Sequence, residues 1–158
     1  MLKILLVSNE DACRSRMAEA LLSSFGRGMM ITTAGICEAN RVPEAVGEVM
    51  EQVGHEISRA KPTALAHRLA STYDFVITLC KEAEEEWKRT NMGVAHMAHL
   101  DFADPLANAE GDEQALRESI ETVYQEMDRV LYRLYRDELR ELLLPRCSCG
   151  ANTFCRCQ

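Results

Sequence analysis

Residues 8–14 combine a hydroxyl, two carboxylates, a thiol and a guanidinium in the short stretch Ser-Asn-Glu-Asp-Ala-Cys-Arg. An apolar run precedes this stretch and an amphipathic pattern follows it, so we expect a strand, a loop and the start of a helix. A loop at a helix N-terminus directs several backbone N–H groups at one point, where an oxyanion can bind. Arg14 adds a permanently charged group that can hold two oxygens of such an anion. The stretch therefore predicts a site for a phosphate-like oxyanion.

The spacing Ser-x5-Arg-Ser over residues 8–15 resembles the C-x5-R-S signature of the low-molecular-weight protein tyrosine phosphatases and of the related thioredoxin-coupled arsenate reductases. The Met-Ala-Glu that follows is typical of the arsenate reductase branch. Further segments that resemble the family occur in the expected order, at residues 32–35, 40–58, 76–80 and 101–105. The resemblance covers about residues 2–140 and implies chemistry on phosphate or arsenate, with the first cysteine of the loop as nucleophile.

The loop departs from the family pattern at three positions. Ser8 stands where the family has its nucleophilic cysteine, Glu10 where it has glycine, and Asp11 where it has asparagine. A serine needs an adjacent general base to become nucleophilic, and two carboxylates beside the loop repel a dianion. We therefore expect a pseudoenzyme with weak or no activity, which binds an oxyanion, a metal or a partner. Arg14 either holds an anion or pairs with Glu10 or Asp11.

The resemblance also assigns candidate residues across the chain. Asp104, in the Asp-Pro pair, matches the general acid, and Cys80 matches the second cysteine of the arsenate reductase relay, whose third position holds Trp87. The catalytic candidates are Ser8, Cys13, Arg14, Ser15, Cys80 and Asp104. The oxyanion-binding candidates are Ser8, Asn9, Glu10, Asp11, Ala12, Cys13 and Arg14.

An active enzyme is the alternative hypothesis. It would be a phosphatase that uses Ser8 or Cys13, or a thiol-dependent arsenate reductase that uses Cys13 and Cys80 with cysteines from the end of the chain. The other interpretation of both body cysteines is that they are small buried residues. The partners that the resemblance implies are phosphate, arsenate or a phosphoprotein, together with thioredoxin or glutaredoxin.

The last twelve residues hold four of the seven cysteines, as two C-x-C pairs. Four thiolates on a short segment suit tetrahedral zinc or a similar thiophilic ion. Disulfide exchange and a disordered appendage are the alternatives. The metal-binding candidates are Cys147, Cys149, Cys155 and Cys157.

Composition narrows the class of protein. The net charge of −7 argues against nucleic acid and anionic membranes as partners. We find no apolar stretch long enough to span a bilayer and no signal peptide, and we expect a cytoplasmic protein. Seven cysteines in that compartment indicate redox chemistry or metal binding rather than structural disulfides.

Apolar runs that alternate with helical patterns predict the fold. We expect strands over residues 2–7, 29–33, 75–79 and, more weakly, 94–100. Helical spacing occurs over 15–25, 43–53, 63–69, 81–90 and 113–143. This alternation predicts an α/β three-layer sandwich, with a mainly parallel four-stranded sheet and helices on both faces. Residues 1–143 form the phosphatase-like domain, and residues 144–158 form the cysteine-rich tail.

Overall fold

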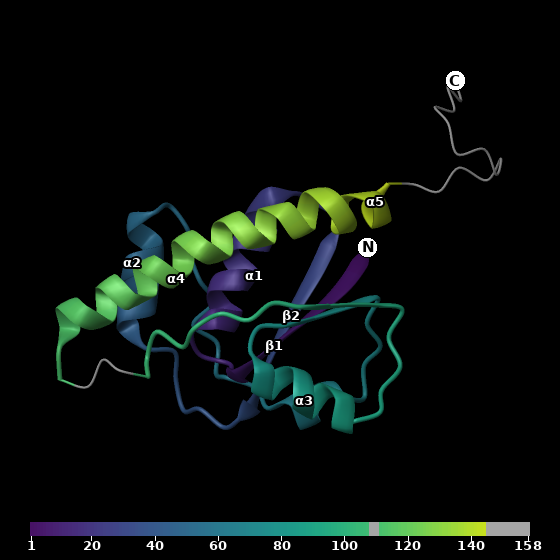
Figure 1. Ribbon diagram of the computed structural model, residues 1–158, viewed down its shortest axis with the longest axis horizontal. Helices are drawn as coiled ribbons and strands as arrows, with labels where there is room; N and C mark the ends of the chain where they lie inside the picture. The colour runs from purple at the N-terminus through teal and green to yellow at the C-terminus, as the bar shows by residue number, and fades with distance from the viewer. Residues whose placement is uncertain (108–110, 145–158) are drawn as a thin grey trace, which may run out of the picture.

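A four-stranded parallel sheet forms the centre of the computed structural model, which describes residues 1–107 and 111–144 (Figure 1). The strands lie in the order β2-β1-β3-β4. Their bounds are β1 Leu2–Glu10, β2 Met29–Cys37, β3 Phe75–Thr78 and β4 His96–His99. All three neighbouring pairs are parallel. The predicted sheet is thereby confirmed.

Helices cover both faces of the sheet, which confirms the three-layer α/β architecture (Figure 1). Helices α1 Arg14–Phe25, α2 Glu44–Gln52 and α4 Glu113–Leu134 pack on one face. Helix α3 Lys81–Arg89 and the short helix η1 Leu65–Arg68 pack on the other. Alternate residues of β1 divide between the two cores: Ile4 and Leu6 face α1, whereas Leu5 and Val7 face α3. All four are fully buried, as the continuous apolar run predicts.

Several elements differ in extent from the prediction. The first strand continues beyond Val7 to Glu10, because β2 also extends and pairs with it up to Cys37. The helix expected over 63–69 is only a 3-10 turn of four residues. The helix expected over 113–143 contains a π-helical turn, η2 Tyr135–Leu139, before α5 Arg140–Leu143. The predicted stop at Gly54 is confirmed, since its φ of +86° ends α2 in a conformation that favours glycine.

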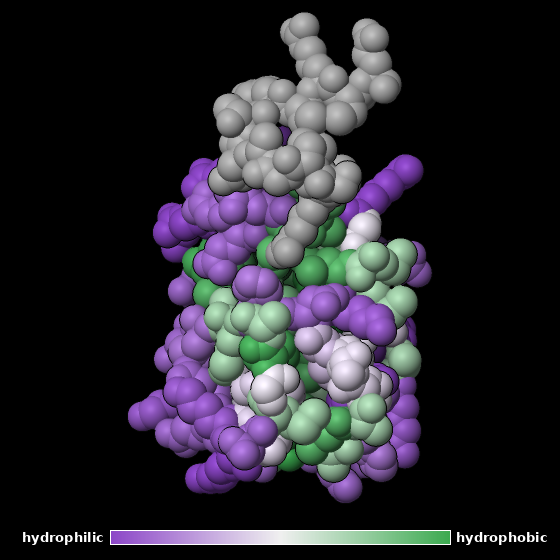
Figure 2. All heavy atoms as spheres, turned by 90° about the vertical axis from the view of Figure 1, so that its right-hand side faces the viewer, coloured by the Kyte–Doolittle hydropathy of each residue, from purple (hydrophilic) through white to green (hydrophobic). Residues whose placement is uncertain are grey.

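One face of the molecule carries a band of hydrophobic side chains. Viewed from the right-hand side of Figure 1, hydrophobic side chains lie between polar margins (Figure 2). The large apolar side chains most exposed in the described residues are Met1, Met30, Val53, Met92, Met97, Tyr132 and Leu144. Within residues 1–107 and 111–144, no helix has the length and apolar character needed to cross a membrane.

Candidate functional site

The carboxyl ends of β1 and β3, with the segment after β4, bring the candidate residues together. Leu79 donates its backbone N–H to the Val7 carbonyl at 2.9 Å, so Cys80 follows next to the end of β1. The Phe102 N–H donates to the Leu79 carbonyl at 3.1 Å, and this bond fixes the segment that carries Asp104. Ligand sites of parallel sheets lie at this edge. The structure therefore gathers residues 8–14, 80 and 104 at one end of the sheet.

The first half of the candidate loop is strand rather than loop. Ser8 and Glu10 lie in register with Gly35 and Cys37 of β2. Only residues 11–13 form a turn before α1 begins at Arg14. Gly35 permits this close approach, because a Cβ there would lie 2.5 Å from the Asp11 backbone nitrogen. The backbone that was expected to surround an oxyanion is thus paired with β2 over part of its length.

Ser8, which the resemblance places at the nucleophile position, has no exposed surface. Its hydroxyl donates to the Glu10 carbonyl at 2.5 Å. No histidine or carboxylate hydrogen-bonds to this hydroxyl among the residues that the structure describes. The serine therefore lacks the general base that its activation requires.

Asp11 points inward and is only 1% exposed. Its carboxylate accepts hydrogen bonds from the Ser15 hydroxyl at 2.8 Å, from Arg16 Nη2 at 3.0 Å and from the Thr63 backbone N–H at 3.0 Å. Arg16 also donates through Nε to the Asp11 carbonyl at 3.3 Å. The carboxylate that was expected to repel an anion is thus paired with Arg16 inside the protein. The Ser15 hydroxyl donates to the same carboxylate.

Arg14 binds neither Glu10 nor Asp11. Its Nη1 donates to the Phe102 carbonyl at 2.8 Å, and the residue is only 7% exposed. The cavity that Arg14 lines with Asn9, Glu10, Cys13 and Asp104 has a volume of about 10 Å³. Such a space is at the lower limit for one water molecule and is too small for a phosphate or arsenate ion. The arginine is therefore in the right place to hold an anion, but the space beside it is closed.

The two body cysteines that were candidate nucleophiles are buried. Burial raises the pKa of the Cys13 thiol far above its ordinary value, the Asp104 carboxylate raises it further, and Arg14 only partly opposes this. Burial also raises the pKa of Cys80. Both are free thiols, and they pack in the cores on opposite faces of the sheet. In both cases burial works against the thiolate form that nucleophilic attack requires.

Asp104 is exposed, and its carboxylate accepts the Leu106 backbone N–H at 3.0 Å. It lines the same small cavity as Cys13 and Arg14, so the position that the resemblance assigns to the general acid is retained. Cys37, which was not a candidate, is an exposed thiol whose Sγ lies 3.5 Å from Asn9 Oδ1. The candidate metal ligands in the tail lie outside the described residues. Within those residues, no group of three His, Cys, Asp or Glu side chains is placed to hold a metal ion.

Sequence analysis missed Arg16 and Thr63, which hold Asp11 in place. The signal available in the sequence was an arginine five positions after an aspartate, close to the start of a predicted helix. Thr63 was not predictable, because its contact with Asp11 spans 52 residues of chain.

Comparisons with known proteins identify the family of the chain. Residues 3–140 match the family described as Low molecular weight phosphotyrosine protein phosphatase. The chain is 35% identical over 80 residues to the glutaredoxin arsenate reductase of Synechocystis, a match that covers 51% of this chain and 61% of that protein. It is 32% identical over 105 residues to the arsenate reductase of Bacillus subtilis, covering 66% of this chain and 73% of that one.

Among solved structures, the low molecular weight protein tyrosine phosphatase from T. tengcongensis has a similar fold, with a TM-score of 0.71. The superposition covers 86% of this chain and 99% of that chain, at 17% sequence identity. At this identity the likeness concerns the fold alone.

Proposed function

Since the chain belongs to the low molecular weight phosphotyrosine protein phosphatase family, we propose that it is a pseudoenzyme whose anion site is filled by its own groups. The observation that carries this proposal is the state of Ser8, which is fully buried and donates to the Glu10 carbonyl. The nucleophile position thus holds a residue that has neither access to a substrate nor a base to activate it.

The surroundings of Arg14 support the same conclusion. Arg14 uses Nη1 to bind the Phe102 carbonyl, and the cavity of about 10 Å³ beside it would have to enlarge before an oxyanion could reach the remaining N–H groups. Phosphate and arsenate should therefore bind weakly. We expect the protein to bind a metal or a partner instead.

Activity measurements test the proposal directly. Reduced, metal-free protein should hydrolyse p-nitrophenyl phosphate no faster than buffer, and it should not reduce arsenate with thioredoxin or with glutaredoxin and glutathione. A family member with an intact cysteine loop is the positive control. Turnover that disappears in Ser8→Ala would show that the serine works as a nucleophile, and the proposal would be wrong.

An anion titration gives an independent test. Calorimetry with arsenate, phosphate and sulfate should show no binding at micromolar concentrations. Micromolar binding that is lost in Arg14→Ala would contradict the closed site.

The active-enzyme alternative rests on one observation, namely that Cys13, Arg14 and Asp104 line the same cavity. These groups would act as a displaced nucleophile, an anion holder and a general acid, and Cys80 with tail cysteines would complete a thiol relay to thioredoxin or glutaredoxin. The raised pKa of the Cys13 thiol argues against this function. Cys13→Ser decides between the two, because loss of a measured activity in this variant would favour the displaced nucleophile.

For the tail, we propose that Cys147, Cys149, Cys155 and Cys157 bind zinc or a similar thiophilic ion. The support is the ligand type and the close spacing of the two C-x-C pairs. The full chain should then retain about one zinc ion per molecule, and the Cys147→Ser/Cys149→Ser variant should lose it. Cys37→Ser, which removes an exposed thiol from the body of the protein, is the matched control.

A further inference from the structure

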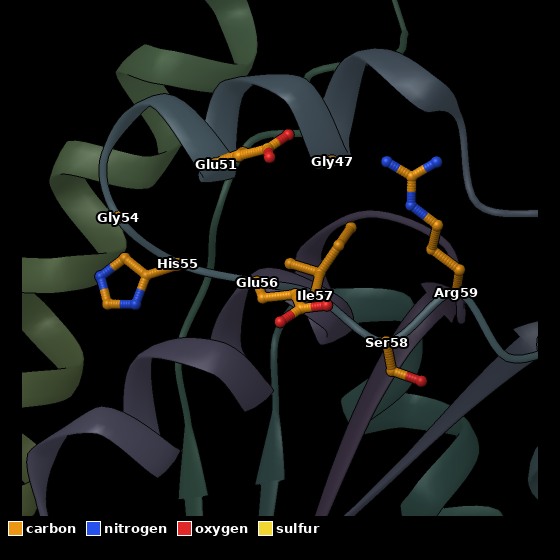
Figure 3. A pocket seen from close by; sticks show the side chains of 8 residues that line it. All are labelled: Gly47, Glu51, Gly54, His55, Glu56, Ile57, Ser58 and Arg59. Atoms are coloured by element: carbon orange, nitrogen blue, oxygen red, sulfur yellow. The ribbon is translucent and has the colours of Figure 1, made fainter.

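A hollow of about 770 Å³ lies between α2 and the segment that follows it, residues 54–59 (Figure 3). It shares no lining residue with the small cavity beside Arg14. Its volume falls within the range of small-molecule sites in proteins. The hollow is therefore a separate place where a ligand can bind, and its use does not depend on the function proposed for the loop.

Three charged side chains line the hollow without neutralising one another. Glu51, from α2, and Arg59, from the following segment, reach into it from opposite sides, and Glu56 lies below them (Figure 3). Across the part of the chain that the structure describes, none of these three side chains forms an ion pair. Other surface carboxylates do, since Glu48 pairs with Arg117 and Glu84 pairs with Lys88. The hollow thus presents one cationic and two anionic groups to whatever enters it.

Gly47 shows that the position of the guanidinium depends on α2. A Cβ at residue 47 would lie 2.8 Å from Arg59 Nη2, so a larger residue would push the arginine away from the helix. Glycine is a poor helix former, and this glycine lies within α2 without a positive φ. The glycine therefore leaves the space beside α2 that the Arg59 guanidinium occupies.

A second hollow of about 360 Å³ adjoins the first, because both are lined by Glu56 and Ser58. It is also lined by Glu19, whose Oε2 atom is buried without a hydrogen-bond partner in the described residues. A buried acceptor without a donor is unfavourable, so this oxygen is suited to receive a hydrogen bond from a ligand. Glu19 and Glu56 line this second hollow, whereas Glu51 and Arg59 do not.

We infer that this hollow binds a small zwitterion, a molecule of amino-acid or dipeptide size that carries both an ammonium group and a carboxylate. Arg59 would hold the carboxylate with its forked N–H groups, and Glu51 and Glu56 would accept hydrogen bonds from the ammonium. A simple anion would meet two carboxylates for one guanidinium. A simple cation would meet the guanidinium, so a ligand with both charges fits the arrangement best.

Amide NMR shifts of the full chain, titrated with glycine and with glycylglycine, test this inference. We expect saturable shifts at residues 47 and 51–59, with a millimolar Kd that weakens as the salt concentration rises. The two probes distinguish a free amino acid from the longer charge separation of a peptide. Because exposed ion pairs contribute little, Arg59→Gln should raise the Kd by about fivefold. Gly47→Ala should also raise the Kd by about fivefold, although it retains every charge. The control is Glu44→Gln, which removes a carboxylate of α2 outside the hollow and should leave the Kd unchanged.

Three results would overturn the inference. The first is the absence of saturable shifts at these amides with either zwitterion. The second is an equal Kd for acetate alone, which would make the hollow a simple anion site. The third is an equal loss of affinity in Glu44→Gln, which would attribute the binding to the net charge of the surface. Thermal unfolding of each variant checks that its fold is retained, and Arg59→Gln keeps the test available if Gly47→Ala is unstable.

Discussion

Asp11→Asn introduces the asparagine that the family resemblance implies at this position, and we expect it to destabilise this chain. Asp11 and Arg16 form an ion pair at 3.0 Å, and their side chains are 1% and 4% exposed. Removal of one partner leaves the other charge buried and uncompensated, which costs about 3–5 kcal/mol. Arg16 retains a bond to the Asp11 carbonyl and a long one to the Lys61 carbonyl, so the lower end of this range applies.

Urea denaturation of the reduced protein measures this loss. A decrease of about 3 kcal/mol in the free energy of unfolding is a large part of the 5–15 kcal/mol typical of a domain. With an m-value of about 2 kcal/mol/M, the midpoint would fall by about 1.5 M urea. The control is Asp137→Asn, which breaks the exposed pair with Arg136 and should cost less than about 1 kcal/mol.

A double-mutant cycle separates the ion pair from other effects of the substitution. Asp11→Asn combined with Arg16→Met removes both charges and keeps an unbranched side chain at residue 16. We expect this variant to regain stability relative to Asp11→Asn, with a coupling of about 2 kcal/mol or more. The reasoning is refuted if Asp11→Asn costs less than about 1 kcal/mol, or if the losses of the two single variants simply add in the double variant.

Three further predictions concern the same end of the sheet. Gly35→Ala should lower the free energy of unfolding by about 2–4 kcal/mol in urea, because its Cβ would lie 2.5 Å from the Asp11 nitrogen, whereas Gly93→Ala, with nothing within 4 Å, should be nearly neutral. Iodoacetamide at pH 8, followed by peptide mass mapping, should label exposed Cys37 well before buried Cys13 and Cys80; equal rates would contradict their burial. Since burial raises the pKa of Cys13 above its ordinary value of 9.0, the unfolded chain loses this proton first, and stability should fall above pH 9.0 by up to about 1.4 kcal/mol per pH unit. Cys13→Ala should flatten this slope, and an unchanged slope would contradict the prediction.

Local sequence patterns predicted the layers of the fold because burial leaves a periodic signal. The run from Ile4 to Val7 is fully buried, with alternate residues in two different cores, and only a strand between two helix layers buries every side chain in this way. The end of α2 was predicted from Gly54, since positive φ has a residue preference that can be read locally. Each of these features depends on neighbours in the sequence.

The closed site was not predictable, because it depends on contacts between residues that lie far apart in the sequence. The length of β1 depends on its pairing with Cys37, and the orientation of Asp11 depends on the Thr63 N–H. The partner of Arg14 is a backbone carbonyl 88 residues away, which leaves no trace in side-chain types. From the sequence, we expected Arg14 to bind either an anion or a loop carboxylate. In the structure its partner is the Phe102 carbonyl.

Ser8, Glu10 and Asp11, where the resemblance implies other residues, act together in the structure rather than one by one. The extension of β1 to Glu10 buries Ser8 and directs its hydroxyl to the Glu10 carbonyl, while Asp11 turns away from the anion position and pairs with Arg16. A thiol at residue 8 would therefore lie in a fully buried place, and burial would raise its pKa as it does for Cys13. We therefore expect Ser8→Cys alone to give a protonated thiol rather than a thiolate, because residue 8 lies in a paired strand and not in an electropositive loop. Thiolate chemistry at this position would require the strand to shorten and Asp11 to leave Arg16, and the buried ion pair opposes that step.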